Sequence, residues 1–205
     1  MISRRAFVIG APLLAAGCGA EAVWAPDDMV ARNIYRDDGP PRITLMTMKA
    51  VSNGQGAHSA LIINASQRVI WDPAGTFKHP SIAERNDVIF GATPRLEQFY
   101  ISYHSRATFY TTIMDRDVPT SVAESALNAV MAYGAVPKAN CSRSTSMILR
   151  QLPGFESIRV TYFPNNLEER FGSLPGVATR DYYEDDSADK SVAAAELDAA
   201  IRARE

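Results

Sequence analysis

Two β-forming runs joined by three residues limit the fold of this chain more than any other feature of its sequence. The runs, residues 58–64 and 68–72, are rich in isoleucine and other strand-forming residues. Their spacing predicts an antiparallel hairpin. The turn would bring Asp72, which ends the second run, level with His58 at the start of the first. Because side chains alternate across a strand, one face of the first run would carry His58, Ala60, Ile62 and Asn64.

Further segments extend this hairpin with strands and helices. Strand-forming residues predict strands over 43–48, 108–114 and 158–162, and a shorter strand over 100–103. The pattern from Ser121 to Glu124 fits a capping box, which predicts a helix that ends at Gly134. A second helix is predicted to open at Asn140-Cys141, and a short one over 167–171.

Composition narrows the class of protein. The chain has 205 residues, of which 46% are hydrophobic, and its formal net charge is −2. These values are typical of one folded domain with tails, and they argue against nucleic acid as a partner. The two cysteines, Cys18 and Cys141, exclude a disulfide framework, so each thiol needs its own explanation.

Residues 1–17 have the layout of a secretory signal. A basic start with Arg4 and Arg5, similar to a twin-arginine export signal, precedes an apolar run too short for a permanent membrane span. The following LAAGC, which ends at Cys18, resembles the processing box of bacterial lipoproteins. Acylated Cys18 would then anchor the protein to a membrane on the periplasmic side of the bacterial cell envelope. The alternative is cleavage near Ala16 by the ordinary signal peptidase.

The rest of the chain divides into three expected parts. Residues 18–41 contain prolines and aspartates without an apolar period, which indicates a tether. Residues 42–178 contain the predicted strands and helices and form the expected domain. Residues 179–205 are first acidic and then rich in alanine, which indicates a tail that carries at most one loosely docked helix.

The motifs favour thiol chemistry over metal or nucleotide chemistry. The three histidines lie 21 and 25 residues apart without a ligand motif, and neither a phosphate-binding loop nor a Gly-x-Ser-x-Gly elbow occurs, so no metal and no cofactor are expected. Cys141, by contrast, is predicted in the first turn of a helix, where free amides stabilise a thiolate. The alternative role for Cys141 is that of a small buried core residue.

A nucleophilic thiol needs a base, and the base needs a group that orients it. His58 is placed to be that base, because it starts a strand directly after a glycine-containing loop. Asp72 is the carboxylate that the hairpin brings beside it. Taken singly, His58 also fits a solvated strand end, and Asp72 an Asp-Pro turn.

The order of these features resembles the circularly permuted branch of the NlpC-type papain-like superfamily, which includes lecithin:retinol acyltransferase-like proteins. The matching segments are 56–63, 68–73 and 140–145, and the resemblance covers residues 43–175. It implies a papain-like α+β fold with a mainly antiparallel sheet packed against the helix that carries the cysteine.

The resemblance also implies roles for three residues: Cys141 as nucleophile, His58 as base, and Asp72 as the group that orients the imidazole. Asn64 competes for the third role because it shares a strand face with His58. It lies six residues along the strand, however, about 20 Å away at 3.3 Å per residue, which is too far.

The expected function is therefore that of an exported, lipid-anchored thiol hydrolase, either an amidase or peptidase or an acyltransferase. It would act on amide or ester bonds. The location suggests cell-wall (peptidoglycan) peptides as the substrate, and a lipid is the alternative substrate. The alternative from another class is a non-catalytic envelope lipoprotein that uses the same scaffold as a binding module.

Overall fold

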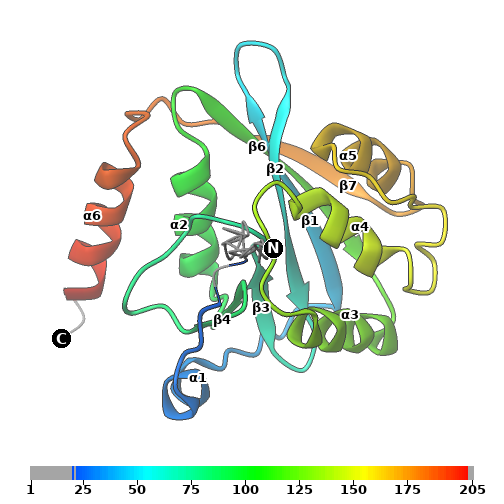
Figure 1. The fold of residues 1–205 in the computed structure, drawn as a ribbon, viewed down its shortest axis with the longest axis horizontal. Helices are drawn as coiled ribbons and strands as arrows, with labels where there is room; N and C mark the ends of the chain where they lie inside the picture. The colour runs from blue at the N-terminus through cyan, green and yellow to red at the C-terminus, as the bar shows by residue number, and fades with distance from the viewer. Residues whose placement is uncertain (1–19, 21, 203–205) are drawn as a thin grey trace, which may run out of the picture.

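The predicted hairpin lies at the centre of an α+β fold. The computed structural model, which describes residue 20 and residues 22–202, contains one antiparallel sheet of seven strands in the order β4-β5-β3-β2-β1-β6-β7 (Figure 1). The strands are β1 (Arg42–Ala50), β2 (Gly56–Asn64), β3 (Arg68–Trp71), β4 (Glu84–Arg85), β5 (Val88–Phe90), β6 (Phe109–Asp117) and β7 (Ala178–Tyr182). The helices are α1 (Asp27–Asn33), α2 (Pro94–His104), α3 (Thr120–Tyr133), α4 (Cys141–Leu149), α5 (Pro164–Gly172) and α6 (Lys190–Arg202).

The strands β2 and β3 form the predicted hairpin. Their register pairs Asn64 with Arg68 at the turn and Leu61 with Trp71 at the other end. After Trp71 the chain of β3 leaves β2, so the start of β2 around His58 has only β1 as a strand neighbour among the described residues. The consequence is a free stretch of β2 edge beside His58, where another element can approach.

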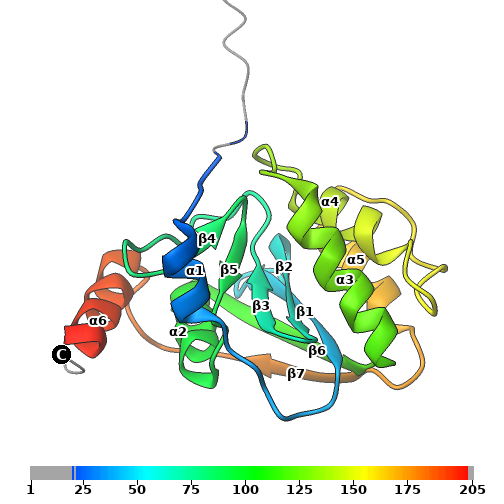
Figure 2. The same cartoon turned by 90° about the horizontal axis from the view of Figure 1, so that it is seen from below.

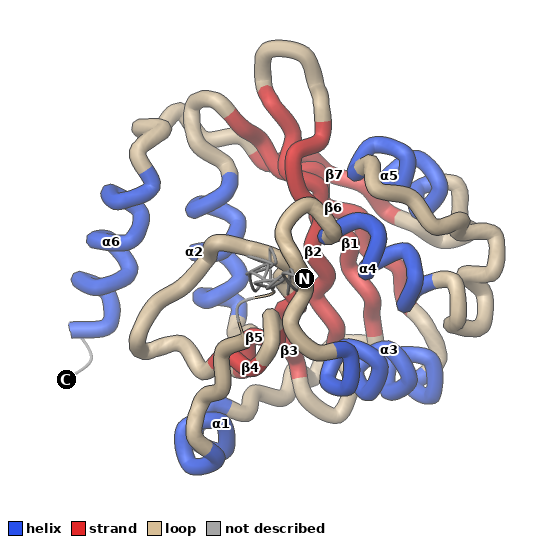
Figure 3. Tube along the Cα trace, viewed as in Figure 1, coloured by secondary structure: helices blue, strands red, loops and turns tan. Residues whose placement is uncertain are grey.

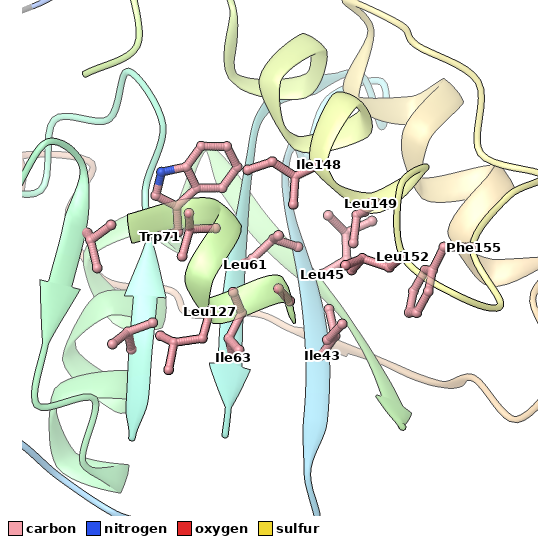
Figure 4. Close-up of a cluster of buried hydrophobic side chains, with 14 of the residues drawn as sticks. Ile43, Leu45, Leu61, Ile63, Trp71, Leu127, Ile148, Leu149, Leu152 and Phe155 are labelled. Carbon is pink, nitrogen blue, oxygen red and sulfur yellow. The ribbon is translucent and has the colours of Figure 1, made fainter. Parts of the chain in front are cut away.

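One face of the sheet is mostly apolar. Helices α3, α4 and α5 cover this face, whereas α2 and α6 lie on the other side (Figures 1 and 2). Alternate strand residues point into the contact, and Figure 4 shows how they pack against the helices. This α3–α5 face includes Ile43, Leu45, Leu61, Ile63, Trp71, Leu127, Ile148, Leu149 and Phe155.

The opposite face mixes apolar and polar side chains. Ala60 and Ile62 of β2 point to this side, as the alternation from His58 predicted, and they pack with Met46 and Met48 of β1. Helix α2 covers them with Tyr100 and Ile101, and α6 adds Leu197. This α2 face is the one to which His58 belongs.

Two helices begin as predicted, but neither by the expected cap. Helix α3 starts after Pro119 without a side-chain cap, and Glu124 instead accepts hydrogen bonds from the backbone and hydroxyl of Ser66 at the hairpin turn. Helix α4 starts at Cys141, yet the Asn140 side chain donates to the Lys138 carbonyl (3.0 Å) rather than capping the helix. A better acceptor or donor nearby displaced the local cap in both cases.

The segment 100–103, predicted as a strand, is the end of helix α2. Pro94 suits the first turn of a helix, where its missing N–H is not needed, and the Thr93 side chain accepts from the Leu96 N–H (3.2 Å). The buried residues of α2 are Tyr100, Ile101 and His104, which have helical rather than alternating spacing. The strand prediction was therefore wrong, because the Thr93 cap and the first-turn proline set a helix, whereas the tyrosines and isoleucine of residues 100–103 taken alone favour a strand.

The segment 158–162, also predicted as a strand, belongs to no sheet. Its Thr161 N–H donates to the Ser146 hydroxyl of α4 (3.1 Å), so it runs along that helix as a loop. Figure 3 shows the long loops before and after α4, residues 134–140 and 150–163.

The expected tether and tail both contain ordered structure. Within 18–41, helix α1 forms, and Ala25 is buried against the core while Trp24 bridges to Arg85. Within 179–205, most of β7 pairs with β6, and α6 packs on α2. Side-chain packing beyond the reach of local sequence patterns orders these segments.

The predicted signal, residues 1–17, and the predicted lipidation site Cys18 lie outside the described residues. Among the residues that the structure describes, no helix has both the length and the apolar character needed to cross a membrane.

Candidate active site

His58 and Asp72 meet where β3 leaves β2. The register places Asp72 one residue past the last pair of the hairpin, diagonal to His58 on the α2 face. His58 Nε2 lies 2.6 Å from Asp72 Oδ1, and the two side chains are 16% and 4% exposed. The hairpin thus brings a carboxylate and an imidazole together in a largely buried place, as the sequence predicted.

The turn after β3 is shaped to hold the Asp72 carboxylate. The Gly75 N–H donates to the Asp72 carbonyl (2.9 Å). A Cβ atom at Gly75 would lie 1.7 Å from Asp72 Oδ2, so no other residue fits here without moving the carboxylate. Glycine at this position lets the backbone pack directly on the side chain.

Cys141 reaches the free edge of β2 from the head of α4. The thiol and the His58 ring lie close enough for each to shift the pKa of the other, and the backbone N–H of Ser59 also lowers the pKa of the thiol. The ring nitrogen left for the thiol is Nδ1, because Nε2 faces Asp72.

A second contact ties the same two elements together one residue further on. The hydroxyls of Ser59 and Ser142 lie 2.9 Å apart, and both side chains are fully buried. Each serine directly follows one of the two reactive residues, His58 or Cys141. This hydrogen bond joins α4 to β2 directly beside the thiol and the imidazole.

A buried aspartate joins the loops on either side of the site. Asp87 Oδ2 accepts from the backbone N–H of Val136 (2.8 Å), in the loop that leads to Cys141. The same oxygen accepts from Ala74 (3.2 Å), in the turn after Asp72. Burial raises the pKa of Asp87, while these two backbone donors oppose the rise. Asp87 thereby holds two chain segments that carry site residues.

The electrostatics of the three side chains favour a thiolate–imidazolium pair. Burial alone would lower the pKa of His58, but the Asp72 charge and the contact with Cys141 raise it to about 10. Burial raises the pKa of Cys141, yet the His58 ring and the Ser59 N–H outweigh this and lower it to about 7. Burial also opposes the charge on Asp72, and His58 nevertheless lowers its pKa to about 2. Above about pH 7 the sulfur is therefore anionic while the ring is still protonated.

Helix α2 adds two buried side chains that the sequence did not indicate. The Tyr100 hydroxyl donates to Asp72 Oδ1 (2.6 Å), and the His104 ring stacks on the His58 ring with centroids 5.9 Å apart. The His104 Nδ1 atom donates to the Tyr100 carbonyl (2.8 Å), and burial lowers the pKa of His104 to about 4. His104 is therefore neutral when His58 is charged.

The predicted site residues are thus brought together, and their competitor is not. Cys141, His58 and Asp72 form one cluster. Asn64 lies at the far end of β2, where its side chain donates to the carbonyls of Gly39 (3.3 Å) and Pro40 (3.0 Å). Among the described residues, no group of three or more His, Cys, Asp or Glu side chains is arranged to hold a metal ion.

The arrangement can carry out nucleophilic chemistry on a carbonyl group. A thiolate attacks carbonyl carbon, and the neighbouring imidazolium can donate a proton to a leaving group. The first amides of α4, which have no partner within the helix, can donate to an oxyanion that forms next to Cys141. Comparisons of the chain with protein-family models, with curated proteins and with solved structures found no match.

Proposed function

We propose that this protein is a thiol hydrolase or acyltransferase that acts on amide or ester bonds. The observation that carries the proposal is the contact of the Cys141 thiol with the ring of His58, whose other nitrogen is held by Asp72. A buried thiol that serves only for packing needs neither an imidazole beside it nor a carboxylate that orients that imidazole. The lowered pKa of Cys141 supplies the thiolate near neutral pH.

The reaction proceeds in two halves. The Cys141 thiolate attacks the carbonyl carbon, and a C–S bond forms as the carbonyl electrons move to oxygen. The intermediate collapses to a thioester while the His58 imidazolium donates its proton to the departing amine or alcohol. In the second half, His58 takes a proton from water or from an acceptor hydroxyl or amine, which attacks the thioester and releases Cys141 as the thiolate.

The order of elements supports the family resemblance. The histidine lies on a strand, the carboxylate follows the next strand of the hairpin, and the cysteine begins a helix much later in the chain. This is the order in the permuted NlpC-type papain-like branch. We propose a papain-like fold of that type on these grounds.

We also propose that the protein is exported and anchored through acylated Cys18 to a membrane of the bacterial cell envelope. Cell-wall peptides are then the amide substrates within its reach. The test of the anchor is palmitate labelling of the full chain in cells, which Cys18→Ala should abolish and Cys141→Ala should not. Equal labelling of the Cys18→Ala variant contradicts the anchor and leaves the hydrolase proposal unaffected.

The test of the activity is digestion of purified peptidoglycan, followed by analysis of the released peptides. We expect Cys141→Ala and His58→Ala to release at least about a hundredfold less product than the unchanged protein. His79→Ala is the matched control, because His79 is also paired with a carboxylate, Asp198, at 2.7 Å but lies outside the site. Equal release by the Cys141→Ala variant would show that the thiol has no such role.

A thiol titration separates the enzyme from the binding-module alternative. An enzyme of this kind requires alkylation of Cys141 by iodoacetamide with a midpoint near the pKa of about 7. A midpoint near or above 9, the ordinary value for this thiol, would favour a non-catalytic scaffold.

A further inference from the structure

We propose that Tyr100 is a positioning residue for the site: its hydroxyl holds the Asp72 carboxylate in the orientation that keeps the His58 ring against Cys141. The proposal rests on the proposed function, because it concerns the same thiol and imidazole. Tyr100 lies on α2, in a segment separate from those that carry His58, Asp72 and Cys141. It would act through Asp72 and does not touch the sulfur.

The first argument is that two donors share one carboxylate oxygen. The Tyr100 hydroxyl and His58 Nε2 each lie 2.6 Å from Asp72 Oδ1. Rotation about the terminal bond of an aspartate side chain is soft, so a single donor does not fix the plane of the carboxylate. A second donor from a different direction removes that freedom and fixes where Oδ1 lies.

The second argument is that Tyr100 itself is held firmly. The residue is fully buried. Its ring packs edge-on against Phe77, with centroids 5.1 Å apart, and against His104 at 4.4 Å. Burying a tyrosine hydroxyl without a partner is unfavourable, so the hydrogen bond to Asp72 benefits the tyrosine as well as the carboxylate.

The third argument is that the opposite side of the carboxylate is also confined. Asp72 Oδ2 packs against the backbone of Gly75, so closely that a Cβ atom there would lie 1.7 Å away. The carboxylate is thus bounded by His58, Tyr100 and Gly75. Only the Tyr100 hydroxyl among these three can be removed without altering the backbone or the reactive imidazole.

Other titratable groups also face the site, and the Tyr100→Phe change leaves all of them in the protein. His104 on α2 is neutral, and it stacks on His58. Lys190 on α6 acts on both Asp72 and His104 through its charge. Glu84 and Asp87 act through their interactions with Asp72. A shift in the Cys141 titration after removal of one hydroxyl can then be assigned to the Tyr100–Asp72 contact.

The experiment compares the rate of Cys141 alkylation by iodoacetamide against pH in the full chain and in two variants. Tyr100→Phe removes the hydroxyl that bonds Asp72. Tyr103→Phe makes the same change on the same helix, where the hydroxyl donates to the Thr76 carbonyl (3.2 Å) instead. Near-UV circular dichroism checks that each variant is folded.

For Tyr100→Phe we expect the midpoint of the rate curve to move to higher pH by about half a pH unit, so that alkylation at about pH 6 slows about threefold. The reason is that a carboxylate free to turn holds the imidazolium less well against the thiolate. Tyr103→Phe should keep the original curve. An unchanged curve for Tyr100→Phe, or a move to lower pH, overturns the proposal.

A second pair of variants tests that Tyr100 acts through Asp72. In an Asp72→Ala background the carboxylate is gone, so adding Tyr100→Phe should leave the alkylation curve of Asp72→Ala unchanged. A further slowing by threefold or more in the double variant would show a purely packing role and overturn the proposal. The titration does not depend on a substrate, so a failure of the proposed hydrolase activity is seen separately, in the peptidoglycan assay.

Discussion

The two faces of the sheet differ in what they bury. The α3–α5 face is made of aliphatic and aromatic side chains that contact one another over most of the sheet. The α2 face buries His104 and Tyr100 and carries His58 and Asp72 at its edge. Burying ionisable groups is costly unless they are paired, whereas burying apolar ones is directly favourable. The comparison suggests that one face supplies stability and the other holds the charges of the site.

The thiol joins these two faces. Helix α4 packs on the α3–α5 face, yet its first residue reaches His58, which belongs to the α2 face. It can do so because β3 leaves β2 after Trp71 and opens the strand edge. The early end of one short strand is therefore what allows a helix on one side of the sheet to meet an imidazole on the other.

Among the changes that test this division, truncation of a buried side chain on the α3–α5 face should have the largest effect on stability. Ile63 is fully buried there, at the end of β2 far from His58. Ile63→Ala should lower the free energy of unfolding by about 2–5 kcal/mol, because it removes buried methyl groups and leaves a cavity. The measurement is urea unfolding at pH 7, followed by circular dichroism.

Val51→Ala is the control for this change, since Val51 is 49% exposed and its truncation should alter the unfolding free energy by no more than about 0.5 kcal/mol. The folded Ile63→Ala protein should keep the original alkylation curve of Cys141. A shifted curve would mean that the two faces are not separate in function.

The next effect in size is the loss of the imidazole on the α2 face. Without His58, the pKa of Cys141 should rise from about 7 to at least its ordinary value of 9, because the burial that raises it is then less opposed. Alkylation by iodoacetamide at about pH 6 should then slow about a hundredfold. His79→Ala, which removes a different carboxylate-paired imidazole, should leave the rate unchanged. A His58→Ala protein that reacts at the original rate would refute the ion pair.

Local patterns predicted the part of the site that lies on one hairpin and one helix start. His58 and Asp72 could be placed together because a three-residue turn fixes the register of two strands. Cys141 could be placed at a helix start by the Asn140-Cys141 pair. Nothing in these patterns says which strand edge a helix will approach, so the contact of thiol and ring required the tertiary structure.

The residues of α2 escaped prediction for a physical reason. Tyr100 and His104 contact the site from a helix whose register depends on packing against the sheet. The sequence did contain a usable signal, since Thr93-Pro94 is a good helix start and Tyr100 and His104 then lie on one face. Even so, a pairing with Asp72 across 28 residues has no local signature. The strand β7 was missed similarly. Its residues are exposed and mostly polar, and they are held to β6 by backbone pairing and by side-chain bonds such as that of Asp181 with Thr112, which have no local signature.

A smaller effect concerns how the unfolding free energy depends on pH. On folding, the ion pair places on His58 the proton that Cys141 carries in the unfolded chain. The raised pKa of His58 gives stability that is full below its ordinary 6.5 and is lost as pH rises toward about 10. The lowered pKa of Cys141 gives stability that grows as pH rises from about 7 and is full above the ordinary 9.0. Between about pH 7 and 9 the folded and unfolded chains bind equal numbers of protons at this pair, so the two dependences cancel.

Cys141→Ser should reveal the His58 contribution alone. Asp72 still raises the pKa of His58 in this variant, although by less than when Cys141 is also present. Between the ordinary pKa of 6.5 and this raised value, the folded variant binds up to one proton more than the unfolded chain, so its unfolding free energy should fall by up to about 1.4 kcal/mol per pH unit from pH 7 upward. The measurement is the urea midpoint at several pH values between about 7 and 9. The unchanged protein should be nearly flat over this range. Parallel slopes for both proteins would contradict an ion pair in the folded state.

The smallest effect concerns the bond between Ser59 and Ser142, which ties the α3–α5 face to the site. A double-mutant cycle with Ser59→Ala and Ser142→Ala should give a coupling of about 1 kcal/mol in the unfolding free energy, the net value of one buried hydrogen bond.

The thiol titration should separate the two changes. Ser59→Ala keeps the backbone N–H that lowers the pKa of the thiol, whereas Ser142→Ala removes a weak hydroxyl contact to the sulfur at 3.8 Å. We therefore expect a small upward move of the alkylation midpoint for Ser142→Ala and none for Ser59→Ala. Equal moves for both would show that the serine pair acts by placing α4 on β2, and that stability and chemistry are coupled at this one point.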